Sequence, residues 1–134
     1  MAVESIDHIN IRTSDVISTS KFFSDVLQME VCETPGIPDR SMAAWLCDES
    51  GRAVVHVATA EVSYPWELDA EVKAAGSGRV HHVAFRCVGY DETVTRLDQL
   101  RHTFQANVVT EIGLRQLFVT DPNGILVELN FFGD

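Results

Sequence analysis

Hydrophobic and polar positions along the chain follow one pattern twice. The stretch at 6–12 alternates between apolar and polar residues, which is typical of a strand that is half buried. The same pattern returns at 80–86, so that His8 falls on His82 at an offset of 74 residues. Self-similarity at a fixed offset indicates an internal repeat. The sequence therefore predicts two modules of one design.

Each alternating stretch is followed by apolar residues at mixed three- and four-residue spacing, which predicts a helix. The first helix is expected over 16–27 and the second over 94–104. Ser14 or Asp15 is placed to cap the first helix. Asp91 is placed to cap the second, because a side-chain oxygen there accepts from backbone N–H groups that have no partner inside the helix.

Three short strands are expected after each helix. The last two of each set are joined by a turn, at 48–51 in one half and at 121–124 in the other, where Gly and Pro favour the turn dihedral angles. The expected strands are 30–33, 41–47 and 53–59 in the first half, and 107–111, 114–120 and 125–132 in the second. Both halves are thus predicted to run strand, helix, strand, strand, strand.

The closing strands of the two halves also correspond. The residues at 54–58 align with those at 126–130 at an offset of 72, which places His56 opposite Glu128. In each half, one side chain that can bind a metal therefore lies on the first strand and one on the last.

Strand alternation groups the polar side chains of the two opening strands. His8 shares a face with Asn10 and Arg12, and His82 shares a face with Arg86, because alternate side chains of a strand point the same way. The two arginines therefore point to the same side as the candidate metal donors.

If the two halves pair with pseudo-twofold symmetry, the four candidate donors converge on one point. They are His8, His56, His82 and Glu128. Three imidazoles and one carboxylate suit a divalent first-row ion, namely Fe, Mn, Ni, Co or Zn. Any one of these histidines alone is more often a hydrogen-bonded structural residue. Glu128, in the apolar run ILVELNFF, needs a partner or a metal.

Composition limits the partners. The chain has 134 residues, 46% of them hydrophobic, which suits one globular domain. Its formal net charge of −10 repels phosphate and anionic lipid, so neither nucleic acid nor a membrane surface is expected as a partner. Three cysteines with no CxxC pair, and no targeting or membrane-spanning segment, favour a cytoplasmic location.

Four stretches carry a resemblance to a known family. They are DHINIRTSD at 7–15, KFFSDVLQME at 21–30, HHVAF at 81–85 and DPNGILVELNF at 121–131. They resemble the vicinal oxygen chelate superfamily, which includes glyoxalase I, methylmalonyl-CoA epimerase, extradiol ring-cleaving dioxygenases, fosfomycin-modifying transferases and bleomycin-resistance proteins. The last stretch is the most specific, because the family very often ends its second module with DPxGxxxEL and uses that Glu as a ligand.

The resemblance implies an α+β domain of two βαβββ modules, whose eight strands curve into an incomplete barrel around a cleft. One domain is expected over 1–134, with module one at about 4–60, a linker at about 61–79 and module two at about 80–132. Members of the family form sites within one chain or across two, and a homodimer is expected here.

Carried over position by position, the resemblance implies His8, His82 and Glu128 as metal ligands. His56 stands where glyoxalase I and the epimerase usually have Glu or Gln, so it is either a fourth ligand or a general base. Arg12 resembles the arginine by which bacterial glyoxalase I holds a substrate carboxylate. Arg86 is the repeat partner of Arg12, and Asn10 lies two residues before Arg12. Arg12, Arg86 and Asn10 form the expected substrate-binding set.

The expected function is that of a divalent-metal-dependent enzyme with glyoxalase-like lyase or isomerase chemistry. Its substrate is a small, anionic molecule that chelates the ion through two adjacent oxygens. The ion polarises a substrate oxygen, and a neighbouring carboxylate or imidazole moves a proton on the adjacent carbon. Glu128 and His56 are the expected catalytic residues.

Two alternatives stay open. The first is an Fe(II) extradiol dioxygenase, because those enzymes use a histidine as acid and base near the place of His56, although their tyrosine ten residues before the ligating Glu is Phe118 here. The second is a metal-free protein that binds a drug, as bleomycin-resistance proteins do. Those proteins generally lack the ligand set that this chain carries.

The remaining aromatic residues near these motifs receive structural interpretations. Trp45 and Trp66 are expected to anchor the core or a loop. His81 is expected to face away from His82, because neighbouring side chains of a strand point to opposite faces.

Overall fold

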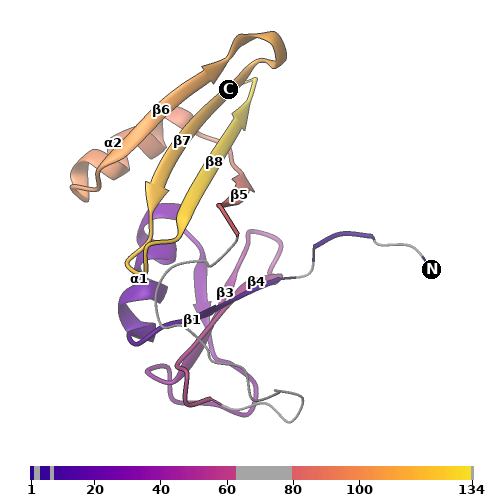
Figure 1. The fold of residues 1–134 in the computed structure, drawn as a ribbon, viewed down its shortest axis with the longest axis vertical. Helices are drawn as coiled ribbons and strands as arrows, with labels where there is room; N and C mark the ends of the chain where they lie inside the picture. Colours follow the sequence, from indigo (N-terminus) through magenta and orange to yellow (C-terminus); the bar gives the residue numbers. More distant parts are fainter. Residues whose placement is uncertain (2–3, 7, 63–79, 134) are drawn as a thin grey trace. The chain divides into compact units, whose positions relative to one another are not determined.

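The computed structural model describes residues 1, 4–6, 8–62 and 80–133. The chain divides into two compact units, Met1–Ala75 and Gly76–Asp134, and each is described by itself (Figure 1). Most of the expected linker, including Trp66, lies outside the described residues. The expectation that both modules form one domain stays a prediction.

In its described residues, the first unit has one four-stranded sheet and one helix. Its elements are β1 (Ile9–Arg12), α1 (Val16–Leu27), β2 (Glu30–Cys32), β3 (Ala43–Cys47) and β4 (Ala53–Ala58). The strand order is β1-β4-β3-β2, with β1 parallel to β4 and the other neighbours antiparallel. The strands lie where the apolar pattern predicts them, with shorter ends.

The second unit repeats this design. Its elements are β5 (Val83–Arg86), α2 (Tyr90–Gln99), β6 (Phe104–Val109), the short 3₁₀ helix η1 (Thr110–Ile112), β7 (Leu114–Thr120) and β8 (Leu126–Phe132). The strand order is β5-β8-β7-β6, and β5 is parallel to β8. The predicted two-module α+β fold is confirmed. Each sheet has two edge strands, so neither closes into a barrel by itself.

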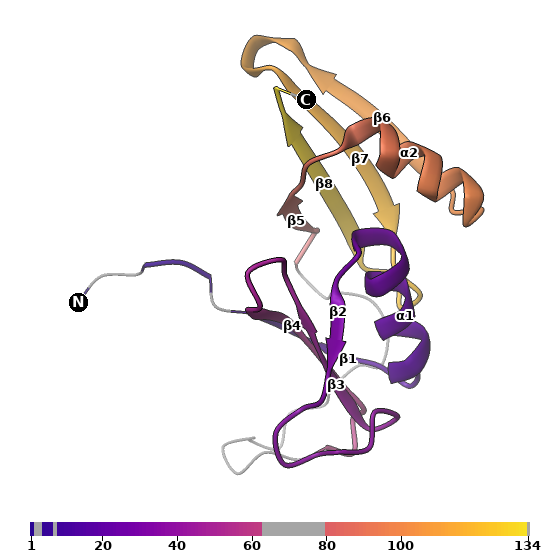
Figure 2. The same ribbon diagram turned by 180° about the vertical axis from the view of Figure 1, so that it is seen from behind.

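The core of the first unit lies between α1 and one face of its sheet. Figure 2 shows the ribbon of α1 and of these strands from behind. Phe23 of α1 is fully buried, as are Leu46 of β3 and Val55 of β4. Burying a side chain of this size contributes roughly 1.5–3 kcal/mol to folding. The opposite face of the sheet is therefore left for polar and aromatic side chains, among them His56.

Asp15, and not Ser14, caps α1. The Asp15 carboxylate accepts a 2.9 Å hydrogen bond from the backbone N–H of Ser18, which satisfies one of the donors that the first helical turn leaves without a partner.

A residue with a left-handed backbone follows the last turn of both α1 and α2. Gln28 and Arg101 adopt left-handed backbone conformations, with φ of 55° and 59°. The backbone N–H of the next residue then returns to the helix, from Met29 to the Phe23 carbonyl in α1 and from His102 to the Leu97 carbonyl in α2. The return bond spans five residues in α2, where the Arg101 N–H also donates to the Asp98 carbonyl, as in the Schellman pattern of helix termination. In α1 the return bond spans six residues, so the two units share the left-handed residue but not the hydrogen bonds that follow it.

Two expectations about α2 are wrong. The helix was expected to reach Phe104, but the left-handed turn at Arg101 ends it, and Phe104 opens β6 opposite Val119. Asp91 was expected as the cap, but the cap position belongs to Gly89, whose φ is 83°, and Asp91 lies in the first turn. There its negative charge still interacts favourably with the helix dipole.

The turns before the two closing strands are also equivalent. The backbone N–H of Asp48 donates to Arg52, and that of Asp121 donates to Ile125, at 2.9 Å in both cases. Each aspartate then accepts from two later backbone N–H groups through its Oδ1. The hydrogen bond from the Ser50 hydroxyl, followed by that from the Arg52 backbone N–H, holds the pKa of Asp48 below its usual value.

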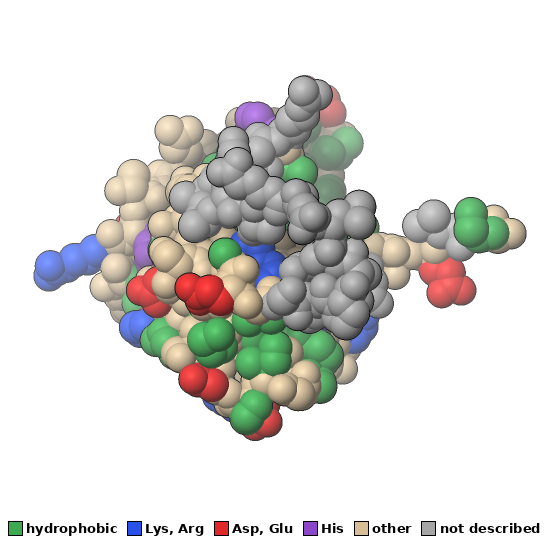
Figure 3. Space-filling view, turned by 60° about the horizontal axis from the view of Figure 1, so that its bottom comes forward, with side chains coloured by type: hydrophobic (Ala, Val, Ile, Leu, Met, Phe, Trp, Pro, Cys, Tyr) green, Lys and Arg blue, Asp and Glu red, His purple; other side chains and the backbone are tan. Residues whose placement is uncertain are grey.

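Within the part of the chain that the structure describes, no helix has the length and apolar character needed to cross a membrane. Figure 3 shows acidic and basic side chains interspersed with uncharged ones on the face that it presents.

Candidate functional site

His8 and His56 form the first donor pair. His8 directly precedes β1, and the register of β1 with β4 pairs Asn10 with His56. The two imidazole rings are stacked, with centroids 3.8 Å apart and planes inclined by 15°. His56 is half buried and His8 is exposed. The ring atom Nε2 of His56 also lies 3.1 Å from the Ala53 carbonyl oxygen.

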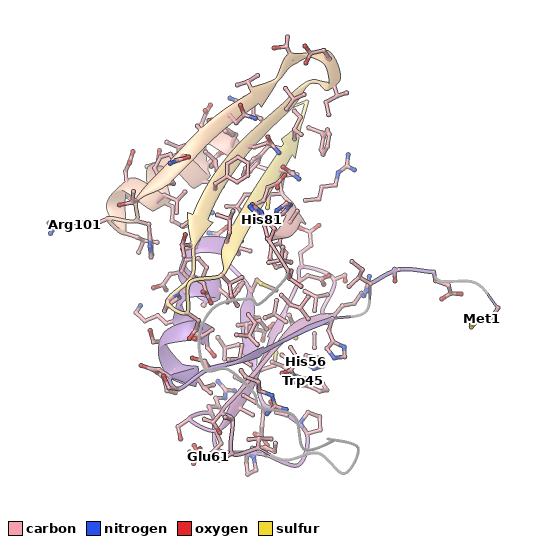
Figure 4. The ribbon with its side chains drawn as sticks, viewed as in Figure 1. Met1, Trp45, His56, Glu61, His81 and Arg101 are labelled. Carbon is pink, nitrogen blue, oxygen red and sulfur yellow. The ribbon has the colours of Figure 1, made fainter. Side chains whose placement is uncertain are left out.

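Trp45 extends this stack. It is the register partner of His56 across β3 and β4, and the two rings are stacked at 4.5 Å with planes inclined by 12° (Figure 4). The ring that precedes β1 and the rings on β4 and β3 thus form a row along the sheet face opposite α1. Sequence reasoning treated Trp45 as a packing anchor and did not place it beside His56. The feature of the sequence that could have placed Trp45 beside His56 is the short turn at 48–51, because this turn determines the register of the two strands.

His82 and Glu128 form the second donor pair. The His82 Nε2 and Glu128 Oε2 atoms are 3.1 Å apart. Glu128 lies in the middle of β8 and is 8% exposed, whereas His82 directly precedes β5 and is exposed. A carboxylate this buried needs a positive or hydrogen-bonding partner. The pair meets that need and leaves the imidazole open to solvent.

Gln116 holds the Glu128 carboxylate from the other side. Its Nε2 donates to Glu128 Oε1 at 2.6 Å and to Asn130 Oδ1 at 3.2 Å. Its Oε1 accepts from Asn107 Nδ2 at 2.8 Å. The result is a polar row across β6, β7 and β8 that directs one carboxylate oxygen to Gln116 and the other to His82. Gln116 was not predicted from the sequence. Its position on β7, two residues before Phe118, places it on the same face of the strand as Phe118, which is the register partner of Glu128.

His81 lies differently from the expectation. Its Nδ1 is 2.9 Å from Nδ1 of His82, so the two rings contact each other. The alternation argument fails because β5 begins only at Val83, and strand alternation does not apply to residues outside the strand. His81 is labelled in Figure 4.

The predicted substrate-binding residues, Arg12, Arg86 and Asn10, differ in their partners and in their exposure to solvent. Arg12 Nη1 donates to the backbone carbonyls of Thr59 and Val62, at 2.9 Å each. The Arg86 guanidinium lies over the Phe132 ring, 4.5 Å from its centroid, and is exposed. Asn10 is also exposed. Arg12 therefore secures the chain after β4, while Arg86 presents a cation to solvent.

The strand registers test the alignment of the two halves. Asn10 pairs with His56 in the first sheet, and Ala84 pairs with Glu128 in the second. The equivalence of His56 and Glu128, proposed from an offset of 72, is thus confirmed. Phe118 is the register partner of Glu128, as Trp45 is of His56.

The donor chemistry fits a divalent ion. Imidazole nitrogen and carboxylate oxygen are donors that divalent first-row ions bind, and the nitrogen and oxygen of the second donor pair are 3.1 Å apart. Among the described residues, no three His, Cys, Asp or Glu side chains gather in one place. The donors stand in two pairs, one in each unit. A single ion held by both pairs stays a prediction.

A hollow of about 270 Å³ in the first unit does not coincide with these residues. It lies along α1 and includes Ile17, Val31 and Ala44 in its lining. Ala44 belongs to the sheet face opposite that of Trp45 and His56, so the hollow lies apart from the first donor pair.

A family model described as the Glyoxalase/Bleomycin resistance protein/Dioxygenase superfamily matches residues 5–129. Among curated proteins, none matches this sequence. A structure from the mobile metagenome of V. pseudocholerae is 16% identical, has a TM-score of 0.76, and is matched over 100% of this chain and 98% of that one.

Two further solved structures have named activities. Lactoylglutathione lyase from Agrobacterium tumefaciens is 18% identical with a TM-score of 0.69, over 98% of this chain and 96% of that one. The fosfomycin resistance protein from Listeria monocytogenes is 13% identical with a TM-score of 0.64, over 97% and 94%. At these identities the likeness concerns the fold alone.

Proposed function

Because this chain belongs to the glyoxalase/bleomycin resistance protein/dioxygenase superfamily, we propose that it is a divalent-metal-dependent lyase or isomerase. Its substrate is a small, anionic molecule that binds the ion through two adjacent oxygens. The observation that carries the proposal is the second donor pair, a buried carboxylate oxygen 3.1 Å from an imidazole nitrogen. The equivalent strand positions of the other unit hold the first donor pair, which supports the same role there.

In this proposal His8, His82 and Glu128 hold the ion, which is Fe, Mn, Ni, Co or Zn. When bound, such an ion supplies Lewis-acid stabilisation of negative charge on a substrate oxygen. His56 is either a fourth ligand or the base that moves the proton at the adjacent carbon. Its half-buried ring, stacked between His8 and Trp45, is held in one orientation, as a general base requires.

Substrate binding is assigned to Arg86 and Asn10, with Arg12 in support. Arg86 is exposed and its guanidinium plane is kept in place by the Phe132 ring, so it can receive a carboxylate as a planar, two-donor partner. Arg12 Nη1 is already used by two backbone carbonyls, and its part in the proposal is to order the segment after β4.

Ion binding to the metal-free protein tests the proposal. Metal-free protein is titrated separately with Ni²⁺, Co²⁺, Mn²⁺, Zn²⁺ and, without oxygen, Fe²⁺, and the melting temperature is recorded. An ion present at about 100 times its Kd stabilises the folded state by about 2.7 kcal/mol, a rise on the order of 10 °C. Acetohydroxamate, which chelates through two oxygens, should then bind to the ion-loaded protein only.

The matched control is His102→Ala, which removes a histidine outside both donor pairs and should leave the ion response unchanged. If no ion raises the melting temperature of the unaltered protein, the proposed function is wrong. The metal-free, drug-binding alternative then becomes the better interpretation.

An Fe(II) extradiol dioxygenase is the second candidate. The observation in its favour is the imidazole of His56 stacked on that of His8, an arrangement suited to an acid and base beside a metal ligand. Protein reconstituted with ferrous iron under nitrogen is mixed with a panel of catechols, and oxygen uptake is followed. Uptake that depends on both iron and catechol would favour this candidate over the lyase or isomerase.

Gln116→Leu is expected to weaken ion binding by about 10- to 100-fold, because partners that orient a ligating side chain have effects of this size. Leucine removes the 2.6 Å hydrogen bond that fixes Glu128 Oε1 while keeping the side-chain volume. The dissociation constant is measured by competition with a chelator of known affinity. Asn107→Ala, which removes only the outer member of the polar row, should change it little.

The proposal also includes a homodimer in a reducing, cytoplasmic compartment, to which the three free cysteines lend support. Light scattering over a range of concentrations tests the oligomeric state. A monomer throughout would remove the homodimer from the proposal and leave its chemistry in place.

A further inference from the structure

Cys32 and Cys47 lie side by side on the neighbouring strands β2 and β3. Their sulfur atoms are 3.2 Å apart, and the Cys47 thiol donates a hydrogen bond to Cys32. Both are free thiols. Cys47 is buried, whereas Cys32 is half buried and has partial access to solvent. The chain therefore carries one buried and one accessible thiol in contact, in the same unit.

The strand register explains the contact. Cys32 pairs with Trp45, and Cys47 pairs with Glu30, so the two cysteines are diagonal neighbours on adjacent strands. Diagonal neighbours lie on the same face of a sheet, within reach of each other's side chains. The regular pairing of β2 with β3 therefore places the two sulfur atoms together.

We propose that Cys32 and Cys47 form a peroxide-sensitive dithiol site, which a hydroperoxide converts into an intramolecular disulfide. This inference does not rest on the proposed function. A disulfide has an S–S distance of about 2.05 Å, so the two sulfurs must approach by about 1 Å. That movement is open to β2, because this strand has three residues and lies at the edge of its sheet.

The surroundings of the two thiols assign their roles. Burial, followed by the hydrogen bond to Cys32, raises the pKa of Cys47 to about 11, so Cys47 stays a protonated thiol at neutral pH. A protonated, buried thiol is a poor first nucleophile. Cys32 is the more exposed sulfur and meets the oxidant first.

The oxidation balances in two steps. The Cys32 thiolate attacks one oxygen of hydrogen peroxide, the O–O bond breaks, and the leaving hydroxide takes up a proton to become water, which leaves a sulfenic acid on Cys32. The Cys47 sulfur then attacks the Cys32 sulfur and its proton joins the departing hydroxide. One disulfide and two waters form from two thiols and one peroxide.

The disulfide would lie next to the first donor pair. Cys32 is the register partner of Trp45, whose ring is stacked on His56. Disulfides quench the fluorescence of a nearby tryptophan, so oxidation should lower the emission of Trp45. Addition of dithiothreitol should restore it.

Cys87 provides the internal reference. It is the one cysteine of the unit Gly76–Asp134, and burial raises its pKa to about 11, as for Cys47. Its thiol contacts the Phe85 carbonyl oxygen and not another cysteine. Cys87 therefore reports how a thiol of this protein behaves when its hydrogen bond goes to a backbone carbonyl and not to a second cysteine.

The test uses the full chain, reduced and then exposed to stoichiometric hydrogen peroxide. Free thiols are alkylated under denaturing conditions, and the intact mass and peptide map are recorded. We expect the loss of two hydrogen atoms, a Cys32–Cys47 linked peptide, and one alkylated cysteine, Cys87. Without peroxide, all three cysteines should be alkylated.

Variants distinguish the site from general thiol oxidation. Cys87→Ser should form the disulfide as the parent does, whereas Cys32→Ser should not and should keep Cys47 reduced. Cys32→Ala serves the same purpose if the serine variant folds poorly. Oxidation of Cys32 to sulfinic acid with Cys47 still alkylated, a disulfide between two chains, or a disulfide that includes Cys87 would each overturn the proposal.

Discussion

Replacing Glu128 with alanine is expected to remove almost all divalent metal from protein purified without a chelator, while the parent protein carries a nearly stoichiometric amount. Glu128 is the one carboxylate of the two donor pairs, and it is 8% exposed. Its Oε2 is directed to His82 and its Oε1 to Gln116. Loss of an anionic ligand should reduce affinity by more than the roughly 10- to 100-fold that changes around a ligand produce.

Elemental analysis of both proteins after gel filtration measures the effect. The matched control is Glu111→Ala, which removes the same chemical group from an exposed position on η1. It should retain the metal of the parent. Far-UV circular dichroism of each variant shows whether the sheet persists. A Glu128→Ala protein that is folded and keeps its metal would contradict the assignment of Glu128 as a ligand.

Phe131→Ala is expected to destabilise the second unit by about 3–5 kcal/mol, the cost of removing a large aromatic side chain from a packed core. Phe131 is 0% exposed and meets the Tyr90 ring edge to face at 5.4 Å, which ties β8 to α2. The truncation leaves a cavity that neighbouring side chains fill only in part. Urea unfolding, followed by circular dichroism, measures the free energy.

Phe132→Ala is the matched control on the same strand. Phe132 is 41% exposed, on the opposite side of β8, and should cost under about 1 kcal/mol. The contrast tests the strand register, because a shift by one residue would exchange the buried and exposed faces. Equal losses for the two variants would show that β8 is not placed as described.

Much of the fold could be predicted because local rules act on neighbouring residues. Helix α1 has the bounds that its apolar spacing predicts, and β7 runs over 114–120 as expected. The end of α2 could not be predicted in this way. Its apolar spacing continues to Phe104, but a left-handed turn at Arg101, which is not a glycine, breaks the helix first.

The candidate site, too, could be predicted from the sequence only in part. His56 and Glu128 could be matched from their sequence surroundings, and the strand registers confirm that match. The residues that orient His56 and Glu128 could not be identified from their sequence surroundings. Trp45 reaches His56, and Gln116 reaches Glu128, only because β3 and β7 pair with the closing strands in a particular register. The contact of His81 with His82 was missed because the strand begins at Val83 and not at residue 80, so that strand alternation does not apply to either histidine.

The repeat, the order of elements and the four candidate donors can all be recognised from the chain of amino acids, since periodicity, turn residues and a carboxylate in an apolar run are properties of short stretches. The row of rings beside His56, the polar row behind Glu128 and the contact between Cys32 and Cys47 arise only on folding. Each depends on the register of hydrogen bonding between strands that are separate in sequence, because a shift by one residue would move these side chains to the other face of the sheet.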